Sequence, residues 1–174
     1  MKNLYRSPYE AYPFLCDDSN DLRCDFELLT DEIASQIGYL SSLTSDLSIK
    51  KDLLFLCELV YHLNPSLRTS FTITDTEISY LIEIATKLKN ETASRCKLFV
   101  LPQGSTPCCL SHILRVKSKC LVRLLYRYNA QGNEVLDEIF DIANLLSGYF
   151  FYLALKLNEL ENTKEIEYIS RNYK

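Results

Sequence analysis

The hydrophobic residues of this chain recur at helical spacing over long stretches, and this pattern limits the possible fold more than any other feature. Between residues 25 and 43, large apolar side chains follow at steps of three and four, which places them on one face of a helix: Phe26, Leu29, Ile33, Ile37 and Leu40. Glycine and proline, which build the turns of β-folds, occur only four and five times in 174 residues. The pattern therefore predicts an all-α fold.

Four further helices are predicted by the same spacing and by capping residues. They span about residues 49–62, a segment that starts after Thr74 or Asp75, a segment that starts between Ser105 and Pro107, and residues 134–161. The second helix should end before Pro65, because a residue that precedes proline is disfavoured in helical geometry. The fifth is apolar nearly all round, which is typical of a central helix. We expect a single-domain bundle of five helices.

Composition assigns the chain to one globular domain. Residues 1–23 are rich in Tyr, Pro, Asp, Asn and Ser and predict an irregular N-terminal arm, and residues 24–174 form the predicted helical domain. At 47% hydrophobic residues, a chain of this length can bury a full core. The seven cysteines are odd in number and irregularly spaced, so reduced, packed thiols are expected rather than disulfides.

Charge and hydropathy argue against two classes of partner. The net charge of −4 and the pI near 5.3 provide no field that attracts nucleic acid. The N-terminus has no apolar stretch typical of a secretory signal, and the most apolar later run, residues 145–157, is too short to span a membrane and contains Lys156. We therefore expect a cytoplasmic protein that binds neither nucleic acid nor a membrane.

The stretch FVLPQGSTPCCLSHILRVKSKC, residues 99–120, contains the residues most suggestive of chemistry. Cys108, Cys109 and His112 could supply two or three ligands to zinc. No second ligand pair stands at a standard spacing, so packing of the thiols and a hydrogen bond from His112 are favoured, and no metal is predicted. Phe99 and Leu101, before Pro102, are expected to anchor this loop in the core.

The fourth helix combines a predicted inward face with a row of cations. The residues expected to point inward are Cys109, Leu110, Ile113, Leu114, Cys120, Leu121, Leu124 and Leu125. Arg115, Lys119 and Arg123 repeat every four residues and could neutralise a polyphosphate. A solvated face, or pairing with acidic residues such as Asp31 and Glu32, is the favoured alternative for a charge run.

Two polar positions add candidate ligand contacts. Residues 103–106 precede a helix whose free backbone N–H groups could hold an anion, although a single glycine there is more often a turn residue. Asn144 is a carboxamide among apolar neighbours of the fifth helix, so we expect it to be buried and to have a partner. A structural hydrogen bond and a ligand contact in a cleft are equally open.

Three segments, taken together, resemble the trimeric, helical-bundle ATP:cob(I)alamin adenosyltransferase family over about residues 19–160. They are residues 31–38 (DEIASQIG), which are similar to the family's D-E-L-N-S-x-I-G, residues 99–115, which are similar to its F-x-L-P-G-G-S and Leu-His-x-x-Arg segments, and residues 144–158 (NLLSGYFFYLALKLN), which are similar to its N-R-L-S-D-Y-L-F segment with a closing Asn. Three motifs in the same order are more specific than any one of them.

The resemblance implies a homotrimer that binds a corrinoid (cobalamin) and ATP, with Mg, in clefts between subunits. Reduced cobalt would attack the ATP 5′-carbon and release triphosphate. The implied catalytic residues are Phe99, which would keep a ligand off the lower face of the corrin, and the pair of Asp31 and Arg115 across the subunit interface. The implied cofactor-binding residues are Phe99, Asn144, Lys119, Arg123 and Ser105, with Lys119 at a phosphate-binding arginine position. A reductase or a cobalamin-dependent enzyme would be a protein partner.

The chain also departs from the family pattern on the ATP side. The family begins with a Thr-Arg-Thr-Gly-Asp-x-Gly loop around the triphosphate, whereas this chain has no glycine before Gly38. The family's Arg-Arg-Ala-Glu-Arg reads Lys-Cys-Leu-Val-Arg at residues 119–123. One hypothesis is an adenosyltransferase that holds ATP through other residues, such as Arg6, Lys117 and Lys119. The alternatives are a catalytically impaired relative that acts as a corrinoid-binding, carrier or regulatory subunit, and a scaffold trimer without a ligand.

Overall fold

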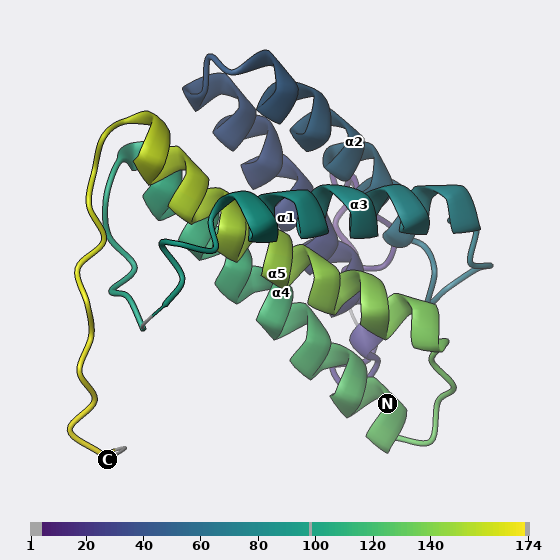
Figure 1. Cartoon of the computed structure of the whole chain (residues 1–174). Coiled ribbons are helices and arrows are strands. Elements are labelled where there is room, and N and C mark those ends of the chain that lie inside the picture. Colours follow the sequence, from purple (N-terminus) through teal and green to yellow (C-terminus); the bar gives the residue numbers. More distant parts are fainter. Residues whose placement is uncertain (1–4, 98, 173–174) are drawn as a thin grey trace.

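The computed structural model describes residues 5–97 and 99–172, which form a bundle of five helices (Figure 1). The helices are α1 (Leu22–Leu43), α2 (Leu47–Leu63), α3 (Asp75–Glu91), α4 (Thr106–Ala130) and α5 (Asp137–Leu160). Within the described residues the only β-type pairing is an isolated antiparallel bridge between Val100 and Glu167. The predicted all-α bundle of five helices is confirmed.

Short polar side chains begin four of the five helices. Asp21, Asp46 and Ser105 accept backbone N–H groups at the starts of α1, α2 and α4, and Thr74 forms a capping box with Glu77 at the start of α3. The cap at Asp21 starts α1 three residues before the predicted position. α2 ends at Leu63, two residues before the proline, as predicted.

α5 begins at Asp137, three residues later than predicted. Its N-cap residue, Leu136, makes no side-chain capping bond. The preceding residues belong to the turn that closes α4, because the Asn133 Nδ2 donates to the Tyr128 carbonyl at 3.1 Å. Apolar spacing alone could not separate this turn from the helix that follows it.

α4 and α5 pack along their length and form the centre of the bundle (Figure 1). α1 packs against both α2 and α4, and α3 packs against α5. Side chains of α5 supply much of the fully buried core: Ile142, Leu146, Tyr149, Phe150, Leu153 and Ala154. Ser111 of α4 ties the pair together, because its hydroxyl donates to the Phe150 carbonyl at 2.8 Å.

α5 is long and apolar enough to cross a membrane by length and composition. However, 56% of its apolar window is buried inside the bundle, which is the environment of a core helix in a soluble domain. Lys156 is partly buried and donates to Glu159 at 2.8 Å. We therefore assign α5 to the core of the helical bundle.

The N-terminal segment is fastened to the bundle by an arginine. Arg68, after α2, donates to the buried Glu27 of α1 at 2.6 and 2.9 Å and to Asp17 at 3.0 Å. Its guanidinium also lies 3.7 Å from the centroid of the Phe14 ring, a cation–π contact. These contacts hold residues 14–17 against the base of α1 and α2.

The C-terminal segment runs beside the loop that precedes α4 (Figure 1). The Tyr168 N–H donates to the Phe99 carbonyl at 2.7 Å, and the Leu101 N–H donates to the Ile166 carbonyl at 2.8 Å. Arg95 forms an ion pair with Glu165 at 2.9 Å. Two segments that are far apart in the sequence are thereby joined around Phe99.

Candidate functional site

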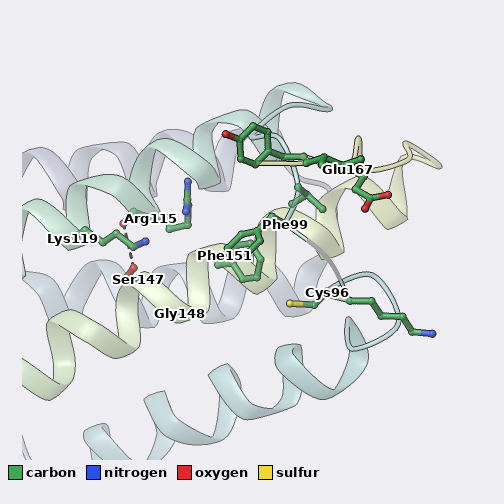
Figure 2. A pocket seen from close by; sticks show the side chains of 12 residues that line it. Cys96, Phe99, Arg115, Lys119, Ser147, Gly148, Phe151 and Glu167 are labelled. Carbon is green, nitrogen blue, oxygen red and sulfur yellow. Dashed lines mark hydrogen bonds between the residues drawn. The ribbon is translucent and has the colours of Figure 1, made fainter. Parts of the chain in front are cut away.

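A cavity of about 810 Å³ lies where the loop before α4, the helices α4 and α5, and the C-terminal segment meet (Figure 2). Its volume is typical of a small-molecule site. Three of the predicted site residues, Phe99, Arg115 and Lys119, line it together. The wall combines aromatic rings from Phe99 and Phe151 with cations from α4, so an apolar ligand face and an anion can be accommodated side by side.

Phe99 is presented to solvent by its backbone. Its side chain is 83% exposed, so the expectation that it anchors the loop in the core is wrong, and Leu101 is also exposed. The main-chain bond from Tyr168 satisfies the Phe99 carbonyl without burying the ring. A single chain gains little from an aromatic ring held in water, so this ring is available to cover a ligand.

Arg115 carries a buried polar atom that nothing in the described chain satisfies. Its Nε is buried and has no hydrogen-bond partner among the described residues. Burial lowers the pKa of this guanidinium. An unpaired buried donor costs about 1–3 kcal/mol, and more when it is charged. An acceptor from a ligand or from a second chain would remove this cost.

Asp31, the predicted partner of Arg115, is bonded elsewhere in the single chain. Its carboxylate accepts the Tyr61 hydroxyl at 2.9 Å, and this bond raises the pKa of Tyr61. The neighbouring Glu32 pairs with Lys117 at 2.7 Å. Pairing with acidic residues therefore holds for Lys117, whereas a pairing of Asp31 with Arg115 across subunits stays a prediction.

Asn144 is exposed, and the expectation that it is buried is wrong. Its amide nitrogen donates to the Phe140 carbonyl one turn earlier at 2.9 Å, so it needs no tertiary partner. It lines a second cavity of about 580 Å³ between α3 and α5. This cavity meets the first at Gly148, which lines both.

The remaining two predicted residues lie outside the main cavity. Ser105 caps α4, because its hydroxyl accepts the Cys108 N–H at 3.3 Å, and its own N–H donates to the Asn158 side chain at 3.1 Å. Arg123 is exposed and lines a shallow groove with Lys119 and Arg127. Sequence reasoning correctly placed Ser105 at the start of α4 and Arg123 within it. It did not predict that both residues lie outside the main cavity.

The cysteine and histidine side chains of α4 do not converge. The thiols of Cys108 and Cys109 lie 3.6 and 3.7 Å from the carbonyls of Gln103 and Gly104, and burial raises the pKa of Cys108 to about 12. The described residues contain no group of three or more His, Cys, Asp and Glu side chains that could hold a metal ion. The Nδ1 of His112 is buried and has no hydrogen-bond partner among the described residues, so this nitrogen does not make the expected hydrogen bond there.

Several cavity residues were missed by sequence reasoning. Ser147 and Phe151 stand four residues apart on α5, so they share the face that looks onto α4, and their spacing could have identified them. The Ser147 hydroxyl donates to the Arg115 carbonyl at 3.4 Å (Figure 2). Tyr168 and Ile169 come from the C-terminal segment, which has no periodic signal.

Comparison with known proteins places this geometry in a family. The profile of the cobalamin adenosyltransferase family matches residues 19–157. No curated protein sequence matches the chain. Among solved structures, a variant PduO-type ATP:corrinoid adenosyltransferase from Lactobacillus reuteri, complexed with cobalamin and ATP, has a TM-score of 0.76 at 24% identity, covering 89% of this chain and 87% of that chain.

Two more variants of the same Lactobacillus reuteri enzyme match similarly. One, complexed with cobalamin and ATP, has a TM-score of 0.76 at 23% identity, covering 87% of this chain and 88% of that chain. An arginine-to-lysine variant complexed with ATP has a TM-score of 0.75 at 24% identity, covering 86% and 88%. At these identities the solved structures support the fold of this chain, and the family profile supports its assignment to the family. The chain belongs to the cobalamin adenosyltransferase family.

Proposed function

We propose that this protein is an ATP:corrinoid adenosyltransferase. The electron pair of reduced cobalt forms a bond to the 5′-carbon of ATP, the bond from that carbon to the phosphate oxygen breaks, and triphosphate leaves with its electrons. Family membership supports this reaction. The observation that carries it is one cavity in which an exposed aromatic ring, Phe99, lies with a half-buried cation, Arg115, whose buried Nε has no partner among the described residues.

The aromatic part of the cavity suits the corrin ring. Phe99 and Phe151 offer apolar surface, and Val100 and Ile169 extend it. A ring packed against the lower face of the corrin keeps water away from the cobalt. Without a lower ligand that donates electrons to the cobalt, adding an electron to the metal is less unfavourable. The cobalt is then easier to reduce, which is the step that makes it a nucleophile.

The cationic part of the cavity suits the triphosphate. Lys119 lines the wall and carries no ion pair among the described residues. A triphosphate has about four negative charges, and each charge-assisted hydrogen bond contributes about 1.5–3 kcal/mol. Any Mg²⁺ would then arrive with the phosphates as part of the substrate.

We propose further that the active unit is a homotrimer with each site between two subunits. α4 exposes Ile113 and Cys120, which the helical pattern had directed inward, and it also exposes Val116. α2 exposes Leu54 and Tyr61, beside Asp31. Two different apolar faces on one chain suit a head-to-tail contact, and such contacts form a closed ring when the rotation between neighbouring subunits is one third of a full turn, as in a trimer.

Mixing two inactive variants tests the site and its location together. Asp31→Asn and Arg115→Gln each remove one member of the proposed pair. In a mixed trimer, an interface between Asp31 of one subunit and Arg115 of the next is intact again. We expect adenosylcobalamin formation, followed by absorbance, to be low for each variant alone and to recover in part after mixing through partial denaturation.

The other outcomes have distinct meanings. No recovery on mixing, with full wild-type activity, would place the site inside one chain. Corrinoid binding without turnover in the wild type would favour a carrier or regulatory subunit instead of an enzyme. A cytoplasmic location, with a reductase or a cobalamin-dependent enzyme as partner, is part of the same proposal, since cob(I)alamin must be supplied reduced and its product used.

A further inference from the structure

A shallow cationic groove runs along α4 beside the main cavity. Its volume is about 390 Å³, and it is lined by Val116, Lys119, Cys120, Arg123 and Arg127. Lys119 also lines the main cavity, so the groove continues the wall that faces Phe99. The family resemblance identified Lys119 and Arg123 as ligand contacts but gave no role to Arg127.

The three cations of this groove form no ion pair within the part of the chain that the structure describes. Within residues 5–97 and 99–172, neither Lys119, Arg123 nor Arg127 has a carboxylate within 4.0 Å, the limit that defines an ion pair. Lys117 of the same helix, by contrast, is neutralised by Glu32 at 2.7 Å. On a chain with a net charge of −4, uncompensated cations at four-residue spacing favour an anionic partner.

The spacing of these side chains suits an extended anion. Residues 119, 123 and 127 stand one turn apart on one face of α4, so the row extends about 12 Å along the helix axis. Arg123 and Arg127 each present a guanidinium fork that can bind phosphate oxygens in pairs. Three positive charges can neutralise most of the negative charge of a triphosphate.

We propose that Arg127 binds the terminal phosphates of ATP, at the far end of a groove that begins at Lys119. The inference rests on the proposed adenosyltransferase function. The 5′-carbon lies at the Phe99 cavity, and the triphosphate follows α4 through Arg123 to Arg127. This arrangement supplies donors that the N-terminal glycine loop of the family would otherwise provide. Lys117, which the sequence offered as a substitute, is engaged with Glu32.

Calorimetric titration with inorganic tripolyphosphate measures this site without turnover. We compare wild type, Arg127→Gln, Arg127→Lys and a matched control, Lys51→Gln, which removes one exposed charge from α2. Loss of one charge-assisted bond predicts that Arg127→Gln weakens tripolyphosphate binding by about 10-fold to 100-fold. Arg127→Lys should keep part of the affinity, and Lys51→Gln should bind as the wild type does.

Steady-state kinetics separate this inference from the proposed function. Arg127→Gln should raise the KM for ATP by the same factor and leave the KM for the corrinoid unchanged. If Arg127→Gln binds tripolyphosphate as tightly as Lys51→Gln does, or if the wild type does not bind it, the role of Arg127 is overturned even when turnover is normal. If the wild type binds tripolyphosphate through Arg127 but shows no turnover, the phosphate site is supported and the proposed adenosyltransferase activity is refuted.

Discussion

Replacing Gly104 with alanine should destabilise the turn that carries the site. Gly104 lies between Phe99 and the start of α4 and has a φ of +144°, a conformation that residues with a side chain rarely adopt. A β-carbon added there would overlap the side chain of Asn158. Asn158 is buried, accepts the Ser105 N–H at 3.1 Å and donates to the Gln103 carbonyl at 3.3 Å.

The expected loss has two parts. The unfavourable backbone conformation costs about 1–3 kcal/mol. Displacing Asn158 breaks two hydrogen bonds, which contribute about 1 kcal/mol each. The sum is about 3–5 kcal/mol, a large share of the stability of a typical domain. For a chain of this length, each kcal/mol lowers the Tm by about 2–4 °C, so a shift on the order of 6–20 °C is expected.

Thermal and urea denaturation measure this loss, and two other glycines provide controls. Gly132 has a φ of +89° with nothing within 4 Å of an added β-carbon, so Gly132→Ala should show the backbone cost alone. Gly148 lies in α5 with equally open surroundings, and Gly148→Ala should be neutral or stabilising by up to about 1 kcal/mol. If Gly104→Ala is no less stable than Gly132→Ala, the clash with Asn158 carries no weight and the reasoning is wrong.

Three further predictions concern groups around the site and the fold. His112 has its pKa lowered from 6.5 to about 4, mainly by burial and also by Arg115, so stability is full above pH 6.5 and falls by on the order of 3 kcal/mol as the pH drops to 4; His112→Leu should flatten urea-derived stability in this window, and an unchanged slope would contradict the assignment. Arg95→Gln removes the ion pair that holds the C-terminal segment beside Phe99, so the KM for the corrinoid should rise severalfold with the KM for ATP unchanged, whereas equal rises would indicate a general defect. Arg68→Met leaves Glu27 buried without its cation and should cost about 3–5 kcal/mol in urea denaturation, and a loss under about 1 kcal/mol would show that the pair is dispensable.

The sequence predicted the helices well because each is recorded in local spacing and local caps. The spacing of apolar residues in α1 and the proline after α2 are signals that extend over only a few residues. They can therefore be recognised in the sequence without knowledge of the tertiary structure. The start of α5 was misplaced because Asn133 closes the preceding turn with a bond back to α4 that no pattern records.

The site was predictable only where a motif named it. Phe99, Arg115 and Lys119 line one cavity of the single chain, and their roles in ligand binding stay a prediction. The exposure of Asn144 was not predictable, because a helix that is apolar nearly all round gives no periodic sign of its solvent side. The C-terminal wall depends on main-chain pairing between residues 99–101 and 166–168, which leaves no trace in side-chain pattern.

The central claim is that Phe99 removes the lower ligand of a bound corrinoid, and the absorbance of cob(II)alamin measures it directly. With ATP present, the wild-type protein should convert cob(II)alamin to a form whose spectrum shows no lower axial ligand, and Tyr9→Ala, at an equally exposed aromatic residue of the N-terminal segment, should do the same. Phe99→Ala should bind the corrinoid without this conversion. An unchanged spectrum with the wild type, or the same conversion with Phe99→Ala, would contradict the account.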